Sequence, residues 1–229
     1  MEKGGSAVEA RLTEIEPGEV LRYLGLRGAA DEELSGQIAR CMEKLREAAS
    51  PRFLWRLFDR ASDGTLIGTG FRPAGEAIAR HLDGCGAVIL MAATLGSGAE
   101  RLIRRAQAAD MAEALVLDAC GSAAIENVCD NLCALLAERF SPRSLTSRFS
   151  PGYGDFPLEQ QRELFAVLDV TRRLGVTLSE GGVMLPQKSV TALIGVSEDE
   201  RAARKEGCDT CPMGGSCAYR KDGERCGKA

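Results

Sequence analysis

The chain has 229 residues, of which 45% are hydrophobic and 27% charged, a balance typical of a globular protein with a substantial core. Its formal net charge of −4 excludes general nucleic-acid binding, which requires a basic surface. The first twenty residues are acidic and lack the apolar stretch of a signal peptide, and the longest apolar run, GAVILMAATLG, is too short to cross a bilayer. We therefore expect a cytoplasmic protein that contacts neither membrane nor nucleic acid.

The first part of the chain mixes helical and strand patterns without regular alternation. Helical patterns are followed by strand patterns in this order: helices at 17–28 and 31–50, then strands at 52–60, 64–73 and 86–96. Asp31 is a typical helix N-cap, and the Asp63-Gly64 pair predicts a turn between the first two strands.

The second part is mainly helical. The expected elements are helices at 98–110, 111–140 and 158–176 and a strand at 182–197 that is interrupted at Pro186. Asp110 is the expected cap of the longest helix, which carries a run of small residues around Gly121. Because glycine inside a helix costs about 1 kcal/mol relative to alanine, close backbone packing or a ligand must compensate there, and we expect packing.

Irregularly mixed helices and strands favour an α+β fold, with helices packed on a twisted, mainly antiparallel sheet. The composition changes near residue 198, where a charged stretch leads into a glycine- and cysteine-rich tail. We therefore expect one domain at 1–197 and a small cysteine-rich extension at 198–229.

The segment SRFSPGYGDFP, residues 147–157, combines prolines and glycines in a short loop. Such a loop can be a rigid connection and nothing more. It can also present backbone amides and carbonyls to a ligand at low entropic cost, with Tyr153 as an aromatic face and Arg148 as a fork for a carboxylate. Both interpretations remain open on the residues alone.

The segment resembles the motif of the reactivation domain of cobalamin-dependent methionine synthase. In that family an arginine, two residues, Pro-Gly-Tyr, three residues and a proline follow one another, as Arg148, 151–153 and Pro157 do here. A Met-x-Pro segment and a Ser-Val-Ser-like strand follow in the family, and 184–186 and 189–191 match them. The resemblance covers roughly residues 85–197.

The resemblance implies that the domain binds S-adenosylmethionine beside a cobalamin and supports reductive methylation of oxidised cob(II)alamin. It implies that Arg148 holds the methionine carboxylate, and that backbone groups of Ser150 and Gly152 take the adenine and ribose. Tyr153 lies against the ligand, and Glu126 (with Asp130 as a weaker candidate) meets the amino group or the sulfonium. Cation, carboxylate and aromatic ring are chemically suited to these partners.

The resemblance also implies partners. In the large synthases this domain is part of a longer polypeptide. The present sequence lacks the cobalamin-binding and methyl-transfer modules of those synthases, so we expect it to be a stand-alone subunit acting in trans. It would be an accessory component of methyltransferase activity in methionine biosynthesis. Its partner would be a cobalamin-binding methionine synthase or another corrinoid protein that carries the cobalamin, with a flavodoxin or ferredoxin as a possible electron donor.

The tail carries four closely spaced cysteines, Cys208, Cys211, Cys217 and Cys226. Thiolates at such spacing predict a metal site, and a 4Fe-4S cluster, structural zinc and redox disulfides all remain open. The other five cysteines lack the spacing of metal ligands and are expected to be small buried residues. Trp55 and Phe58 are expected to lie in the core. His81 is expected to serve a surface or capping role.

The sequence also fits a different class of function. In this alternative the chain is a redox or scaffold protein that binds an iron–sulfur cluster or zinc, and its ligand pocket is vestigial.

Overall fold

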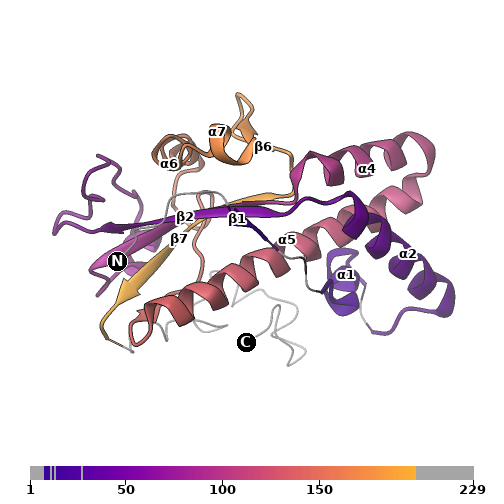
Figure 1. The fold of residues 1–229 in the computed structure, drawn as a ribbon, viewed down its shortest axis with the longest axis horizontal. Coiled ribbons are helices and arrows are strands. Elements are labelled where there is room, and N and C mark those ends of the chain that lie inside the picture. Colours follow the sequence, from indigo (N-terminus) through magenta and orange to yellow (C-terminus); the bar gives the residue numbers. More distant parts are fainter. Residues whose placement is uncertain (1–7, 11, 13, 27, 200–229) are drawn as a thin grey trace.

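The computed structural model describes residues 8–10, 12, 14–26 and 28–199 (Figure 1). Seven helices occur in this part of the chain: α1 (Pro17–Tyr23), α2 (Glu32–Ala48), α3 (Glu76–His81), α4 (Gly96–Ala109), α5 (Met111–Phe140), α6 (Gln161–Leu168) and α7 (Val170–Leu174). The strands are β1 (Val8–Glu9), β2 (Arg52–Asp59), β3 (Ala87–Thr94), β4 (Ser144–Leu145), β5 (Thr177–Leu178), β6 (Met184–Leu185) and β7 (Ser189–Ser197), and a 3₁₀ turn covers Leu158–Gln160.

Five strands form one antiparallel sheet in the order β1-β2-β3-β7-β4, and β5 and β6 form a separate hairpin. The central strand β3 pairs along its whole length with β2 and β7 and is buried throughout. A strand covered on both faces needs apolar residues at every position, which explains the unbroken run AVILMAAT. The predicted α+β fold with a mainly antiparallel sheet is confirmed.

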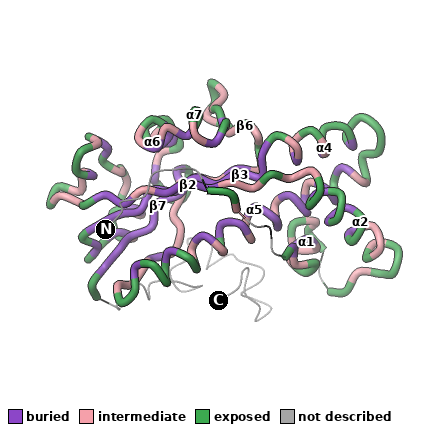
Figure 2. Tube along the Cα trace, in the orientation of Figure 1, coloured by how far each residue is buried: buried purple, intermediate pink, exposed green. Residues whose placement is uncertain are grey.

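Alternate residues of β3 enter two separate cores. Ile89 and Met91 face the larger core, which is built with α1, α2, α4 and α5, whereas Val88 and Leu90 face the core built with α3, α6 and α7. The ribbon shows α5 along one side of the sheet and α6 and α7 on the other (Figure 1). The purple tube in Figure 2 marks the buried strands between these helices.

Two helices begin at the predicted caps. The side chain of Asp31 accepts a hydrogen bond from Leu34 N at 2.8 Å, and Asp110 accepts from Ala112 N and Glu113 N at 2.9 and 3.1 Å. Such bonds satisfy backbone donors that a helix leaves without an internal partner. The cap of α5 also fixes the start of the helix that carries Glu126.

The prediction of a strand at 64–73 is wrong. This segment folds back on itself, and Leu66 and Phe71 are joined by a backbone hydrogen bond of 2.8 Å and are both buried. Gly64, Gly68 and Gly70 have positive φ angles, which extended strands do not use. The apolar residues therefore anchor a turn into the core and do not form one face of a strand.

The predicted single helix at 158–176 is also divided. Asp169 adopts the left-handed conformation, with φ of 56°, and separates α6 from α7. Two arginines of β2 stabilise the helix ends: Arg56 donates to the Val167 carbonyl at 3.0 Å and Arg52 to the Leu174 carbonyl at 2.6 Å. These long-range bonds compensate for the lost helical bonds and were not visible in the local pattern.

The expected strand at 182–197 is present as β6 and β7, with the break at Pro186 between them. Trp55 and Phe58 are buried, as expected. Among the described residues, none of the helices combines the length and the apolarity that a membrane span requires.

Candidate functional site

The proline- and glycine-rich loop is locked onto α3. The carboxylate of Asp155 accepts hydrogen bonds from Glu76 N at 2.7 Å and Ala77 N at 2.8 Å, the first free backbone donors of that helix. A Cβ at Gly75 would lie 2.7 Å from the Asp155 carbonyl oxygen, and one at Gly154 would lie 2.8 Å from Ala77 Cβ. The glycines are therefore required by close packing between the loop and α3.

The loop also closes on itself. Gly152 N donates to the Phe156 carbonyl at 2.8 Å, and Tyr153 N donates to the Ser150 carbonyl at 3.1 Å. The Ser150 carbonyl keeps a second lone pair, so it can still accept from a ligand. The Tyr153 ring is 60% exposed and meets the Phe149 ring edge-on, with 6.1 Å between centroids.

Phe149 attaches the loop to the sheet. Its backbone N–H and carbonyl form a reciprocal pair of 2.9 Å hydrogen bonds with Leu193 of β7. On the side of α3, His81 Nε2 lies 2.9 Å from both the Ser147 carbonyl and Thr146 Oγ1, and its ring is 4.9 Å from that of Phe149. His81 lies in the last turn of α3, is half-buried and contacts the loop, so of the expected surface or capping role the purely surface alternative does not hold.

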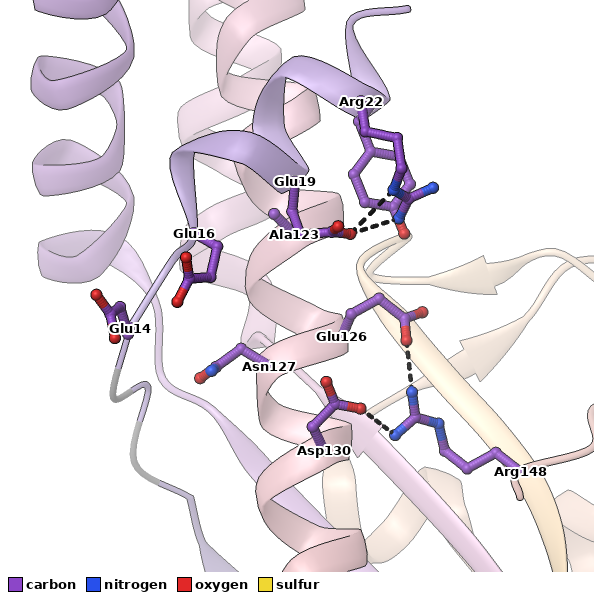
Figure 3. A pocket seen from close by; sticks show the side chains of 10 residues that line it. Glu14, Glu16, Glu19, Arg22, Ala123, Glu126, Asn127, Asp130 and Arg148 are labelled. Carbon is purple, nitrogen blue, oxygen red and sulfur yellow. Dashed lines mark hydrogen bonds and ion pairs between the residues drawn. The ribbon is translucent and has the colours of Figure 1, made fainter. Parts of the chain in front are cut away.

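The Arg148 side chain extends from the loop toward α5, where it pairs with two carboxylates that lie one helical turn apart (Figure 3). Arg148 Nη2 lies 2.7 Å from Glu126 Oε2, and Arg148 Nη1 lies 2.7 Å from Asp130 Oδ1. Cys133 Sγ is a further contact of Nη1, at 3.5 Å. The Arg148 side chain is 21% exposed, against 39% for that of Glu126 and 60% for that of Asp130. The long helix and the loop thus bring together the arginine and both acids that the sequence had suggested.

These three residues line a pocket of about 270 Å³ between α5, α1 and the segment before α1. The other lining residues are Glu14, Glu16, Glu19, Arg22, Tyr23, Ala123 and Asn127. Five carboxylates against two guanidinium groups leave a formal charge of −3. Arg22 is itself paired with Glu19 at 2.6 Å (Figure 3). The pocket can therefore hold a ligand with at least one cationic group, with the paired Arg148 at one end.

The N-terminal wall of this pocket was missed by the sequence analysis. The stretch TEIEPGEV supplies three of the five acids, yet its only sequence signal was a run of alternating glutamates before a predicted helix. Ser150, Gly152 and Tyr153 do not line the pocket; they belong to the turn that follows Arg148. Their predicted roles toward a ligand stay predictions.

Two pKa shifts describe this environment. Burial lowers the pKa of Arg148, but the neighbouring Cys129 and Cys133 and the acids Asp130 and Glu126 raise it by more, so Arg148 remains a cation. Burial is also the main cause that raises the pKa of Tyr23 above its usual value, and its phenol stays neutral at neutral pH.

A second polar cavity, of about 350 Å³, lies where α4 and α5 meet the segment before β7. Lys188 extends across Gly121, where a Cβ would lie 3.0 Å from the lysine Cε. Its ammonium contacts Asp118 at 2.8 Å and Ser122 at 2.9 Å. The close packing expected around Gly121 is therefore provided by a lysine stem.

Thiol chemistry is not favoured in the described part of the chain. Cys41, Cys85, Cys120 and Cys129 are buried, as expected, whereas Cys133 is half-buried. Burial raises the pKa of Cys120 to about 12, so its thiol stays protonated. No group of three or more potential ligand residues suited to a metal occurs among the described residues. Cys208, Cys211, Cys217 and Cys226 lie outside them.

Comparison with known proteins decides the family. The family described as "Vitamin B12 dependent methionine synthase, activation domain" matches residues 88–203, just over half of the chain. The chain belongs to this activation domain family. The match includes α5, Arg148, the loop and the Met184–Pro186 segment, so the sequence resemblance is confirmed.

A solved structure shares the fold. The chain is similar to the MetH reactivation domain, whose crystal structure is described as bound to AdoHcy, with a TM-score of 0.59 and 16% identity. The similarity covers 96% of this chain and 86% of that one. At this identity it shows a common fold and no more. No curated protein matches the chain.

Proposed function

We propose that the chain binds S-adenosylmethionine in the Arg148 pocket and supports reductive methylation of cob(II)alamin. The cobalamin is carried by a cobalamin-dependent methionine synthase or a related corrinoid methyltransferase. The observation that carries this proposal is the convergence of Arg148, Glu126 and Asp130 on one acidic pocket, in a chain of the activation domain family. AdoHcy, the demethylated form of the proposed ligand, is the molecule described in the related structure.

The charges of the pocket suit the ligand's functional groups. S-adenosylmethionine carries a carboxylate, an ammonium and a sulfonium, so it has a net positive charge at neutral pH. Arg148 offers a planar fork for the carboxylate, and Glu126 and the N-terminal glutamates offer negative charge for the two cations. Tyr153, Ser150 and Gly152 would take the adenosine side from the adjoining turn.

The same charges suit the direction of the reaction. A docked corrinoid that has received one electron would supply the nucleophile for the sulfonium methyl group, while the acidic wall and Arg148 would hold the methyl donor. Loss of that methyl group turns the sulfonium into a neutral thioether. The acidic wall then loses one cation to attract, so we expect this pocket to hold the product less tightly than the substrate.

The trans-acting form of this proposal can be tested in a reconstituted reaction. A corrinoid methionine synthase fragment without its own activation domain is prepared in the Co(II) state and mixed with a chemical reductant and S-adenosylmethionine. Methylcobalamin, followed by absorbance, should form only when the present chain is added, and Arg148→Ala should slow it. Equal methylcobalamin formation with and without the chain would refute the proposal.

We also propose that the cysteine tail serves the electron supply. For this role Cys208, Cys211, Cys217 and Cys226 would hold a 4Fe-4S cluster, and a flavodoxin or ferredoxin would be the external donor; zinc at the same cysteines would be structural, because zinc carries no electrons. Metal and sulfide analysis of anaerobically purified protein tests this. Stoichiometric zinc without iron and sulfide would limit the tail to a structural role.

A further inference from the structure

Arg148 is already engaged on two sides in the structure. Each of its terminal nitrogens donates to one carboxylate oxygen at 2.7 Å, one from Glu126 and one from Asp130. A ligand carboxylate binds a guanidinium best through two parallel hydrogen bonds. Each terminal nitrogen keeps a second N–H, but a ligand carboxylate that binds across both nitrogens lies beside the two acids and is repelled by their negative charges. It therefore binds best when one of the acids gives up its contact with Arg148.

The two acids differ in how easily they can give up Arg148. Asp130 is 60% exposed and Glu126 is 39% exposed. An exposed carboxylate that loses its partner is solvated by water, so its release costs little. In Figure 3, Glu126 lies between Arg148 and the α1 side of the pocket, whereas Asp130 lies one turn further along α5. Asp130 is thus the acid that can leave Arg148 while Glu126 stays to face the ligand's cations.

We propose that Asp130 competes with the ligand's carboxylate for Arg148 and so limits the affinity of the pocket. In the empty pocket Asp130 holds the guanidinium in place; on binding, the ligand carboxylate takes over the Nη1 contact. Asp130 is then a specificity-determining residue that selects against molecules whose carboxylate binds weakly. This inference rests on the proposed S-adenosylmethionine site and adds a role that acts through Arg148.

Three ligands separate this role from a structural one. S-adenosylmethionine and S-adenosylhomocysteine both carry the carboxylate, whereas decarboxylated S-adenosylmethionine keeps the sulfonium and the amine without it. For Asp130→Asn, calorimetric titration should show binding of the first two tightened by about two- to fivefold, the range expected on loss of an exposed charged partner. Affinity for the decarboxylated ligand should not rise, because this ligand brings no carboxylate to compete with Asp130 and the variant has less negative charge opposite its cations.

The matched control is Asp118→Asn, on the same helix. Asp118 is 48% exposed and pairs with Lys188 at 2.8 Å in the other cavity, so its loss should leave all three affinities unchanged. Thermal melts of both variants check that they remain folded. Glu126→Gln should act in the opposite direction and weaken S-adenosylmethionine more than S-adenosylhomocysteine, because it removes charge opposite the sulfonium.

The outcomes are distinct. Weaker binding of S-adenosylmethionine to Asp130→Asn, or an equal effect on the decarboxylated ligand, would overturn the competition while leaving the site in place. If neither the wild-type chain nor Asp130→Asn binds any of the three ligands, with or without a docked corrinoid partner, the proposed function falls and the competition falls with it.

Discussion

At the scale of single residues, a few polar groups connect elements that are separate in the sequence. Asp155 reaches the start of α3, and Arg148 reaches two acids on α5. The identity of these residues was readable from the sequence, because the Pro-Gly-Tyr motif and the acidic helix stand out. The partners of Asp155 were not, since residues 76 and 155 are 79 positions apart and the sequence pattern does not show that they meet. The glutamates of the N-terminal wall were missed for the same reason.

The Asp155 contact predicts a pH-dependent stability. Hydrogen bonds from Ala77 N and Glu76 N lower the pKa of Asp155 below its unfolded value of about 3.9. A lowered folded pKa means that the stabilisation is fully present above pH 3.9 and is lost as the pH falls through the folded pKa. Asp155→Asn should therefore lower Tm at pH 7, and the difference from wild type should vanish in acid.

Thermal melts between pH 2.5 and 7 measure this difference. Glu159→Gln, which removes another exposed carboxylate from the segment after the loop without removing a helix cap, is the control. A Tm difference for Asp155→Asn that is independent of pH would contradict the assigned role of the charge.

At the scale of elements, helices were predicted well where periodicity and caps agreed, as in α2 and α5. Errors arose where tertiary contacts override local preference. The broken helix at Asp169 depends on arginines from β2, and the turn at 64–73 depends on Leu66 and Phe71 entering the core. Gly98 is a further example of a tertiary requirement. A glycine is needed there because Ala48, 50 residues earlier in the chain, packs against it, and the local sequence does not reveal this contact.

Gly98 gives a direct test of helix packing. A Cβ at this position would lie 1.9 Å from the Ala48 carbonyl oxygen, so α4 and α2 would have to separate. Gly98→Ala should destabilise the protein by about 1–3 kcal/mol or more, as overpacking does. Denaturant unfolding measures this, with the inner-helix variant Gly36→Ala as control. There the nearest atom is the flexible end of Arg40 at 3.3 Å, and a gain of up to about 1 kcal/mol is expected. Equal effects of the two substitutions would contradict the packing described.

At the scale of the whole molecule, two cores share one central strand. The α+β class and the order of most elements followed from the sequence, because β3 reads as a fully buried strand. The pairing order β1-β2-β3-β7-β4 did not follow, since a strand pattern does not identify its partners. The shared strand also means that neither core can be lost without exposing the other.

This arrangement predicts cooperative unfolding. Ile89 and Leu90 are neighbours that face opposite cores and are both fully buried. Ile89→Ala and Leu90→Ala should each cost about 2–5 kcal/mol, and each should shift a single transition. Fluorescence of Trp55, the only tryptophan, reports on the larger core, and far-UV circular dichroism reports on the whole fold. Separate midpoints by the two probes would show that the cores unfold independently.

The most direct test of the central claim is calorimetric titration of the chain, purified under exclusion of oxygen, with S-adenosylmethionine. Arg148→Ala is compared with Arg143→Ala, whose arginine pairs with Glu198 away from the pocket. We predict binding that Arg148→Ala weakens by about 10- to 150-fold, the loss expected for a charged hydrogen bond, and that Arg143→Ala leaves unchanged. Equal affinity of wild type and Arg148→Ala, or no binding to the wild type with or without a docked corrinoid partner, would contradict the assignment of this pocket.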